Sequence, residues 1–227
     1  MMPGHNRPVD PLWIAVDDFV DEHLTPADEA FEDALRRQRE AGLPDIAVSP
    51  SQGRLLETLA RSTGARRVLE FGTLGGYSTL WLARALPEDG RIVTFEREKK
   101  HAEVALANFA AAGVEDRIEI RVGPAEDLLA TLDGDERYDF VFIDADKPNN
   151  ALYLDAALAH ARPGALVVVD NVVRGGALTD ATSEDPKVRG SRKVVAHAGQ
   201  CPGIAASTVM QTVGRKGYDG FLIAVVG

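Results

Sequence analysis

Residues 67–96, RVLEFGTLGGYSTLWLARALPEDGRIVTFE, decide the fold. A short apolar run, RVLEFG, leads into a glycine-rich turn. The helical pattern YSTLWLARAL follows the turn and ends before Pro87 and Gly90. A second apolar run, RIVTFE, begins at Arg91. Strand, helix and strand in this order predict two parallel strands joined by a crossover helix.

The same alternation continues toward the C-terminus. Further strands are expected over residues 117–123, 138–144, 165–170, 207–214 and 220–226. Helical patterns between them cover residues 97–113, 124–132 and 149–161, and the breaker RPG follows the last of these. The final two strands are joined by only five residues, so they must be antiparallel. We therefore predict an α/β fold, a doubly wound, mostly parallel, Rossmann-like sheet of seven strands with an antiparallel edge.

The first 60 residues have a different pattern and form an N-terminal helical extension, expected to serve as a lid or a dimer contact. The helical patterns span residues 13–24, 25–42 and 49–64. In the first, apolar residues recur at Trp13, Val16, Phe19, Val20 and Leu24. Thr25 is the expected N-cap of the second helix, with Pro26 at its first position, and Ser49 or Ser51 caps the third. Residues 61–227 form the main domain.

Composition narrows the choice of partners. The net charge of -10 argues against nucleic acid or an anionic membrane as the main partner. Cys201 is the only cysteine, which excludes a disulfide within the chain and a thiolate metal cluster. Neither a secretory signal nor an apolar run of about 20 residues is recognisable. We expect a reduced, cytoplasmic setting.

The glycine-rich turn is a candidate ligand site. Gly72, Gly75 and Gly76 let the backbone approach a ligand, although a tight turn alone also favours glycine. Their spacing differs from the dinucleotide pattern G-x-G-x-x-G. Glu96 ends the second strand, where an acid can accept hydrogen bonds from a ribose, and Glu70 can hold a cation. S-adenosylmethionine (SAM) carries a ribose, a cationic amine and a carboxylate, and it fits this set better than a pyrophosphate does.

Two later strands end in oxygen-bearing side chains. The stretch FIDADK (142–147) ends in Asp144, Asp146 and Lys147, and VVVDN ends in Asp170 and Asn171. If these strands are neighbours, the side chains converge. Carboxylate and amide oxygens suit Mg²⁺ rather than zinc. Taken singly, each Asp is equally a turn former, and Lys147 is either a base or a solvated cation.

Six segments give the chain a family resemblance. They are VSPSQGRLL (48–56), VLEFGTLGGYSTLWLA (68–83), IVTFERE (92–98), FVFIDADKPNNALYLD (140–155), VVVDNVVRGG (167–176) and GYDGFLIAVV (217–226). In these segments the chain resembles the cation-dependent class I O-methyltransferases of the catechol and caffeoyl-CoA type, and it is most similar to bacterial members. DADK followed by DN at this separation is highly specific to that group.

The resemblance implies a role for each matching residue. The cofactor SAM would be held by Val48, Glu70, Gly72, Thr73, Ser78, Glu96, Ala125, Asp144 and Asp146. Within this set Glu96 would bind the ribose, Ala125 would lie near the adenine, and Val48, Glu70, Gly72, Thr73 and Ser78 would contact the methionine part. Mg²⁺, Mn²⁺ or Ca²⁺ would be bound by Asp144, Asp170 and Asn171, and Lys147 would be the catalytic base.

The resemblance also implies the partners, and the chain departs from the family pattern at two places. DADK lacks the tryptophan that the animal catechol enzymes carry between Asp and Lys. We expect a small aromatic vicinal diol or phenol as acceptor, and a homodimer. The sequence VVRGG after DN lacks the aromatic and asparagine of the plant enzymes, so a coenzyme A ester is not expected. Arg174 in this stretch is interpreted as solvated, with an anionic substrate group as the alternative. A helix is expected from Asp185.

Two other functions fit parts of the pattern. One is an NAD(P)-dependent oxidoreductase of similar topology, and the other is a non-catalytic SAM-binding protein. Histidines 5, 23, 101, 160 and 197 are scattered along the chain, and we interpret them as surface or packing residues without a ligand role.

Overall fold

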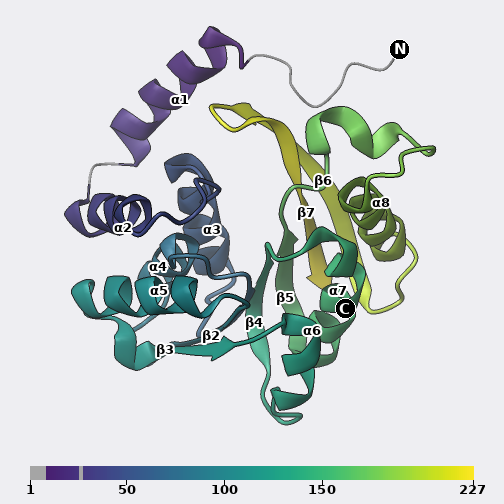
Figure 1. Ribbon diagram of the computed structural model, residues 1–227. Helices are drawn as coiled ribbons and strands as arrows, with labels where there is room; N and C mark the ends of the chain where they lie inside the picture. Colours follow the sequence, from purple (N-terminus) through teal and green to yellow (C-terminus); the bar gives the residue numbers. More distant parts are fainter. Residues whose placement is uncertain (1–8, 26–27) are drawn as a thin grey trace.

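The computed structural model describes residues 9–25 and 28–227. Its strands are β1 (Arg67–Phe71), β2 (Arg91–Glu96), β3 (Ile118–Val122), β4 (Tyr138–Ile143), β5 (Ala161–Val169), β6 (Ile204–Gly214) and β7 (Gly217–Val226). They form one sheet in the order β3-β2-β1-β4-β5-β7-β6 (Figure 1). The first five strands are parallel, and β7 pairs antiparallel with both β5 and β6. The predicted fold class is therefore confirmed.

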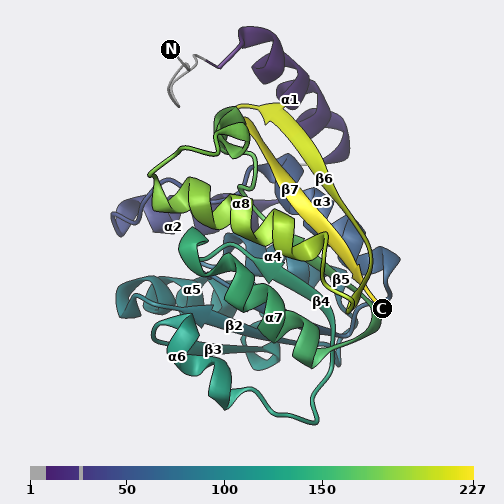
Figure 2. The same cartoon turned by 90° about the vertical axis from the view of Figure 1, so that its right-hand side faces the viewer.

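Helices cover both faces of the sheet. They are α1 (Pro11–Leu24), α2 (Glu29–Glu40), α3 (Pro50–Ser62), α4 (Tyr77–Ala85), α5 (Lys99–Ala111), α6 (Ala125–Leu128), α7 (Asn150–His160) and α8 (Pro186–Ala198). One layer contains α3, α4 and α5 with α2 packed outside, and the other contains α6, α7 and α8 (Figures 1 and 2). No helix within the described ranges is long and apolar enough to cross a bilayer.

Alternating strand residues supply the two cores. Val68 and Phe140 are register partners on β1 and β4, and both are buried against the α3–α5 layer. The next pair, Leu69 and Val141, is buried against the α6–α8 layer. Because successive side chains of a strand point to opposite faces, a sheet covered on both sides needs such continuous apolar runs.

The start of α2 differs from the sequence prediction, and the start of α3 agrees with it. Asp28 caps α2, where its side chain accepts a hydrogen bond from the Ala30 backbone N–H at 3.0 Å. Thr25, the predicted cap, instead ends α1, and Pro26 lies outside the described residues. Asp28 lies two residues before the Ala30 N–H and can accept its hydrogen bond, whereas Thr25 is five residues away. Ser49 caps α3, one of the two predicted alternatives, in a reciprocal capping box with Gln52.

Strand β5 begins earlier than predicted. Ala161 already pairs with Tyr138 of β4, and the register shifts before the next pair, Phe140 with Leu166. The residues between, Arg162 to Gly164, form an irregularity in which Gly164 has φ of 80°. The RPG sequence therefore kinks the strand instead of separating it from α7.

Candidate active site

The ends of β4 and β5 lie side by side and carry the predicted carboxylates. Ile143 and Val169 are the last register pair of these strands. Asp144 and Asp170 each follow by one residue, and the Asp170 backbone N–H donates to the Ile143 carbonyl at 3.0 Å. Asn171 comes next with φ of 58°, and its amide nitrogen lies 3.1 Å from Oδ1 of Asp170. The structure thus brings all three predicted oxygen donors to one edge.

Lys147 reaches the same edge from the short 3-10 segment η3 (Lys147–Asn149). Its Nζ lies 2.5 Å from Oδ1 of Asp144, and the side chain is largely buried. Gly190 of α8 packs directly against the carbonyl of Lys147, where a Cβ would come within 2.1 Å of that oxygen. The close approach of α8 holds Lys147 at the edge of the sheet, so it is not the solvated cation of the alternative interpretation.

The glycine-rich turn lies directly against the end of β4. Gly72 has φ of 96°, and a Cβ on it would come within 2.4 Å of the Asp144 carbonyl oxygen. A side chain at this position would therefore separate the turn from Asp144. In the helix that follows, Gly76 occupies the N-cap position and Ser78 lies inside the first turn.

Glu96 at the end of β2 is held by the backbone of the turn. Its Oε2 accepts hydrogen bonds from the N–H groups of Thr73 at 3.2 Å and Leu74 at 2.6 Å. Its Oε1 lies 3.2 Å from Nδ1 of His101, which also lines the cavity described below. His101, interpreted from the sequence as a surface or packing residue, thus lies at the cavity beside Glu96. Its position in the first turn of α5, directly after β2, is the signal that could have identified it.

Glu70 lies behind the turn and does not line the cavity. Its fully buried carboxylate accepts hydrogen bonds from the hydroxyls of Ser78 at 2.6 Å, Thr79 at 2.5 Å and Thr94 at 2.7 Å. Burial raises the pKa of Glu70 to about 7, the three hydroxyls oppose that rise, and the charge of Asp144 adds to it. Glu70 positions Ser78 at the turn.

Asp146 is fixed by two donors beside the turn. Its carboxylate accepts from the Tyr153 hydroxyl at 2.5 Å and from the Asn149 amide at 2.7 Å. Burial, and then the hydrogen bond to Asp146, raise the pKa of the Tyr153 hydroxyl, which therefore stays protonated as a donor. Asp146 thus lines the cavity with a defined orientation.

Two adjoining cavities meet at these residues. The first has a volume of about 490 Å³. Among the predicted residues, its lining includes Val48, Gly72, Thr73, Ser78, Glu96, Ala125, Asp144, Asp146, Lys147 and Asn171. The second cavity, of about 360 Å³, is lined by Asp170 and shares Val48, Asn171 and Arg174 with the first. The arrangement provides room for two ligands that meet beside Asn171.

The charges at the junction are strongly coupled. Burial raises the pKa of Asp170 well above its ordinary value, the charge of Asp144 raises it further, and the charge of Lys147 lowers it. Two nearby carboxylates with one amine leave excess negative charge, which a cation would neutralise. Over the described part of the chain, no three His, Cys, Asp or Glu side chains form a metal-binding group. A cation here would therefore need the Asn171 oxygen in addition to the two carboxylates.

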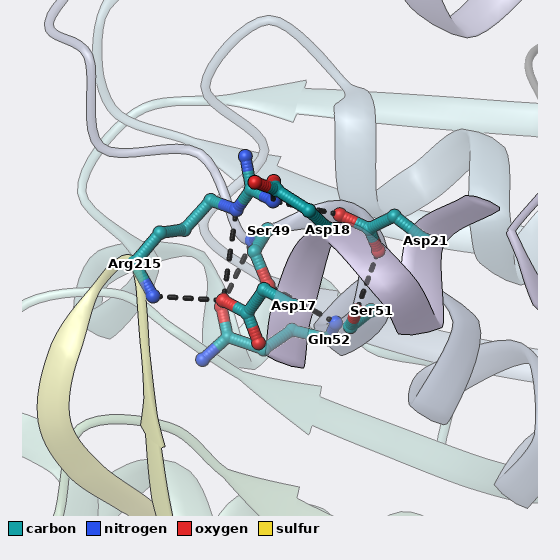
Figure 3. Close-up of polar contacts among 7 residues, drawn as sticks. All are labelled: Asp17, Asp18, Asp21, Ser49, Ser51, Gln52 and Arg215. Atoms are coloured by element: carbon teal, nitrogen blue, oxygen red, sulfur yellow. Dashed lines mark hydrogen bonds and ion pairs between the residues drawn. The ribbon is translucent and has the colours of Figure 1, made fainter. Parts of the chain in front are cut away.

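Helix α1 and the β6–β7 turn both contribute to the lining of the second cavity, and polar side chains join them (Figure 3). The Arg215 backbone N–H donates to Asp17 at 2.7 Å. The Arg215 guanidinium lies 2.8 Å from Asp18 and 3.1 Å from Asp21. Asp21 also accepts a hydrogen bond from the Ser51 hydroxyl at the start of α3. Polar contacts thus join three segments that are far apart in sequence.

Comparison with known proteins agrees with this geometry. Residues 22–205 match the O-methyltransferase family. A catechol O-methyltransferase from Mycobacterium tuberculosis is 52% identical over 211 residues, which cover 93% of this chain and 94% of that protein. The structure of an O-methyltransferase from Bacillus cereus in complex with SAH has a TM-score of 0.92 and 47% identity, covering 95% of this chain and 99% of that one. An O-methyltransferase from Streptomyces achromogenes in complex with SAM has a TM-score of 0.91 and 50% identity, covering 95% and 97%.

The doubly wound sheet and the cavity at its glycine-rich turn define a SAM-dependent methyltransferase. The chain belongs to the O-methyltransferase family, and it is a SAM-dependent O-methyltransferase. The two alternatives, an oxidoreductase and a non-catalytic binding protein, are thereby set aside.

Proposed function

We propose that the enzyme transfers the methyl group of SAM to a hydroxyl of a small catechol-like or phenolic acceptor, with Mg²⁺ or a similar hard cation. The observation that carries this proposal is the grouping of Asp144, Lys147, Asp170 and Asn171 between two adjoining cavities. Relatives with the name catechol O-methyltransferase, at 52% and 44% identity, support the acceptor class.

SAM would occupy the first cavity. Glu96 accepts three backbone N–H groups, from Thr73, Leu74 and Glu98, and lies beside His101 at the cavity wall. The acceptor capacity left on its carboxylate is the proposed contact for the ribose. The proposed methionine contacts are Gly72, Thr73, Ser78 and Val48, with Glu70 acting through Ser78 from behind the turn. Ala125 would face the adenine, and Asp144 and Asp146 would face the cofactor.

The donor set fits a hard divalent cation. Asp144 and Asp170 provide carboxylate oxygens and Asn171 an amide oxygen, the ligand types that Mg²⁺ prefers, and such a site leaves positions for water or acceptor oxygens. When bound, the cation would hold a vicinal diol and favour its deprotonated form. The excess negative charge around the buried Asp170 supports this assignment.

Lys147 is the proposed base. Its Nζ is oriented by Asp144, and the residue lines the first cavity together with Asn171, so it can reach a hydroxyl held there. To accept the proton, the amine must be in its neutral form. Deprotonation and alignment are the main requirements of methyl transfer to oxygen, and residues on both strand ends hold the two reactants in one geometry.

The reaction is tested directly with isotope-labelled SAM. The purified chain is incubated with catechols, hydroxycinnamates and flavonoids, with Mg²⁺, with a chelator, and with the chelator followed by excess Mg²⁺. We expect labelled methyl ethers with Mg²⁺, loss of product with the chelator, and recovery on adding the metal back. Product that persists in the chelator would contradict the metal role, and no transfer to any of the three classes would contradict the acceptor class.

A homodimer is the proposed assembly. Helix α1 turns Asp17 and Asp21 toward the protein body, while Leu12, Val16 and Phe19 are exposed at 66%, 54% and 64%. These three apolar residues lie at helical spacing on one face, and such a face is typical of an interface. Light scattering should give a dimer mass for the wild type and a lower mass for Phe19→Asp. A monomeric wild type would contradict the proposal.

A further inference from the structure

Arg174 is a half-buried cation at the junction of the two cavities. It begins the 3-10 segment η4 (Arg174–Thr179), three residues after Asn171, and it lines both cavities. Its Nε is buried and has no hydrogen-bond partner among the described residues. A buried N–H without a partner is unfavourable, so its retention calls for an explanation.

The backbone holds Arg174 in a conformation that disfavours a side chain. Its φ is 55°, and the next two residues, Gly175 and Gly176, have φ of 64° and 93°. Asp219 of β7 fixes the start of this loop, because its Oδ1 accepts the N–H groups of Val173 at 3.0 Å and Arg174 at 2.9 Å. Glycine would meet this geometry without strain, and strain of this kind gathers at binding sites.

Four carboxylates line the second cavity, and none of them pairs with the Arg174 side chain. Asp170 accepts hydrogen bonds from Asn171. Asp17 contacts Arg215, and Oδ1 of Asp219 accepts three backbone N–H groups, the third from Gly220. Asp45 is exposed. The guanidinium of Arg174, which forms no hydrogen bond or ion pair within the described part of the chain, is therefore left for a group that enters the cavity.

We propose that Arg174 recognises a carboxylate on the methyl acceptor, which deepens and rests on the proposed function. The acceptor class becomes aromatic vicinal diols with an acidic substituent, such as dihydroxybenzoates and dihydroxycinnamates. A guanidinium presents paired N–H donors that match the two oxygens of a carboxylate. Because Arg174 lies next to the proposed metal ligand Asn171, an acid bound to it would have its ring at the junction.

Calorimetry on the complex with SAH and Mg²⁺ tests the recognition directly. We expect 3,4-dihydroxybenzoate to bind about tenfold more tightly than its methyl ester, the size of a charge-assisted hydrogen bond. Arg174→Gln should remove this preference without changing the affinity of the ester, and Arg174→Lys should keep part of it. Arg189→Gln is the matched control, because Arg189 is an exposed cation that pairs with Glu184 outside both cavities.

Three results would overturn the inference. The first is equal affinity of the wild type for the acid and the ester. The second is an equal loss of affinity for acid and ester in Arg174→Gln. The third is weaker SAH binding in that variant. The last would assign Arg174 to the cofactor. Arg174→Gly should melt at or above the wild-type temperature because it relieves the strain, whereas a purely structural arginine would be destabilised on removal.

A second pair of ligands separates this inference from the proposed function. Cinnamate and methyl cinnamate differ in the same charge and carry no hydroxyl to methylate. If no catechol is methylated but cinnamate still binds more tightly through Arg174, the proposed reaction is wrong and the anion site stands. If catechols are methylated but neither acid is preferred over its ester, the reaction stands and the anion site is wrong.

Discussion

Nζ of Lys147 lies 2.5 Å from Oδ1 of Asp144, three residues earlier in the chain. The contact joins the residue after a buried strand to one in a short 3-10 segment. It holds the amine over the edge of the sheet, in the lining of the first cavity. The same Asp144 is a proposed metal ligand, so one carboxylate orients the proposed base and the proposed cation together.

Replacing Lys147 should remove turnover without removing cofactor binding. Lys147→Met keeps the length of the side chain but has no lone pair for a proton. We expect kcat to fall by roughly 100-fold or more, the usual contribution of a general base. SAH affinity, measured by calorimetry, should stay within about twofold because the variant keeps the glycine turn and Glu96. Lys99→Met is the control, since Lys99 is an exposed cation on α5. Wild-type turnover in Lys147→Met would exclude it as the base.

The sheet and the convergence of the strand ends could be predicted from the sequence. Unbroken apolar strands that alternate with helices leave few topologies, and parallel neighbours bring Asp144 and Asp170 together at one edge. Local patterns also placed Ser49 as a possible cap of α3. These features depend on short-range periodicity and on general rules of sheet assembly.

Other features depend on contacts that local patterns do not contain. Glu70 was expected to face the ligand, but register pairing places it beside Thr94 on the face covered by α4, where hydroxyls surround it. His101 contacts Glu96 only because α5 folds back after β2. The position of Arg174 depends on the positive φ of its own backbone and on the hydrogen bond from its N–H to Asp219, which is distant in sequence.

Stability should depend on pH through Glu70. Its pKa is about 7 when folded and near 4.5 when exposed, so the folded protein holds this proton more tightly. The raised pKa contributes roughly 3 kcal/mol to the free energy of unfolding. This contribution is fully present below pH 4.5 and is lost as pH rises through 7. Glu70→Gln has no charge to bury. We expect its free energy of unfolding, relative to the wild type, to increase from pH 4.5 to pH 8.

Urea unfolding at several pH values measures this difference. An effect of the glutamine amide on stability that does not depend on pH cancels. Only the pH dependence of the difference in unfolding free energy between the two proteins reports the ionisation of Glu70. Asp170 also has a raised pKa, but it is present in both proteins and does not enter the comparison. A difference that stays flat from pH 4.5 to pH 8 would mean that folding does not raise the pKa of Glu70.

Gly72 should tolerate no side chain. In Gly72→Ala the new Cβ would meet the Asp144 carbonyl at 2.4 Å, in addition to the strain of φ 96°. We expect a loss of roughly 2–5 kcal/mol in the free energy of unfolding. Gly64→Ala is a matched control, since Gly64 also has positive φ (62°) but has open space around it. If both variants lose the same unfolding free energy, backbone strain explains the whole effect and the contact with the Asp144 carbonyl contributes nothing.

Arg215 should hold α1 against the protein body. Helix α1 has no buried residue, and its contacts with the β6–β7 turn are largely polar. Arg215→Ala would leave Asp17, Asp18 and Asp21 together without the cation that pairs them. We expect amide hydrogen exchange in α1 to accelerate by roughly fivefold to tenfold, as suits a partly exposed ion-pair network. In the wild type, high salt should produce part of the same acceleration by screening.

Arg36→Ala serves as the control for this effect. Arg36 also pairs with two carboxylates, Asp33 and Glu40, but all three lie on α2, away from the turn that holds α1. Exchange in α1 should therefore match the wild type in this variant. If amide exchange in α1 is as slow in Arg215→Ala as in the wild type, the aspartates do not hold the helix. The apolar residues of α1 must then do so, and the proposed dimer contact at Phe19 is where they would pack.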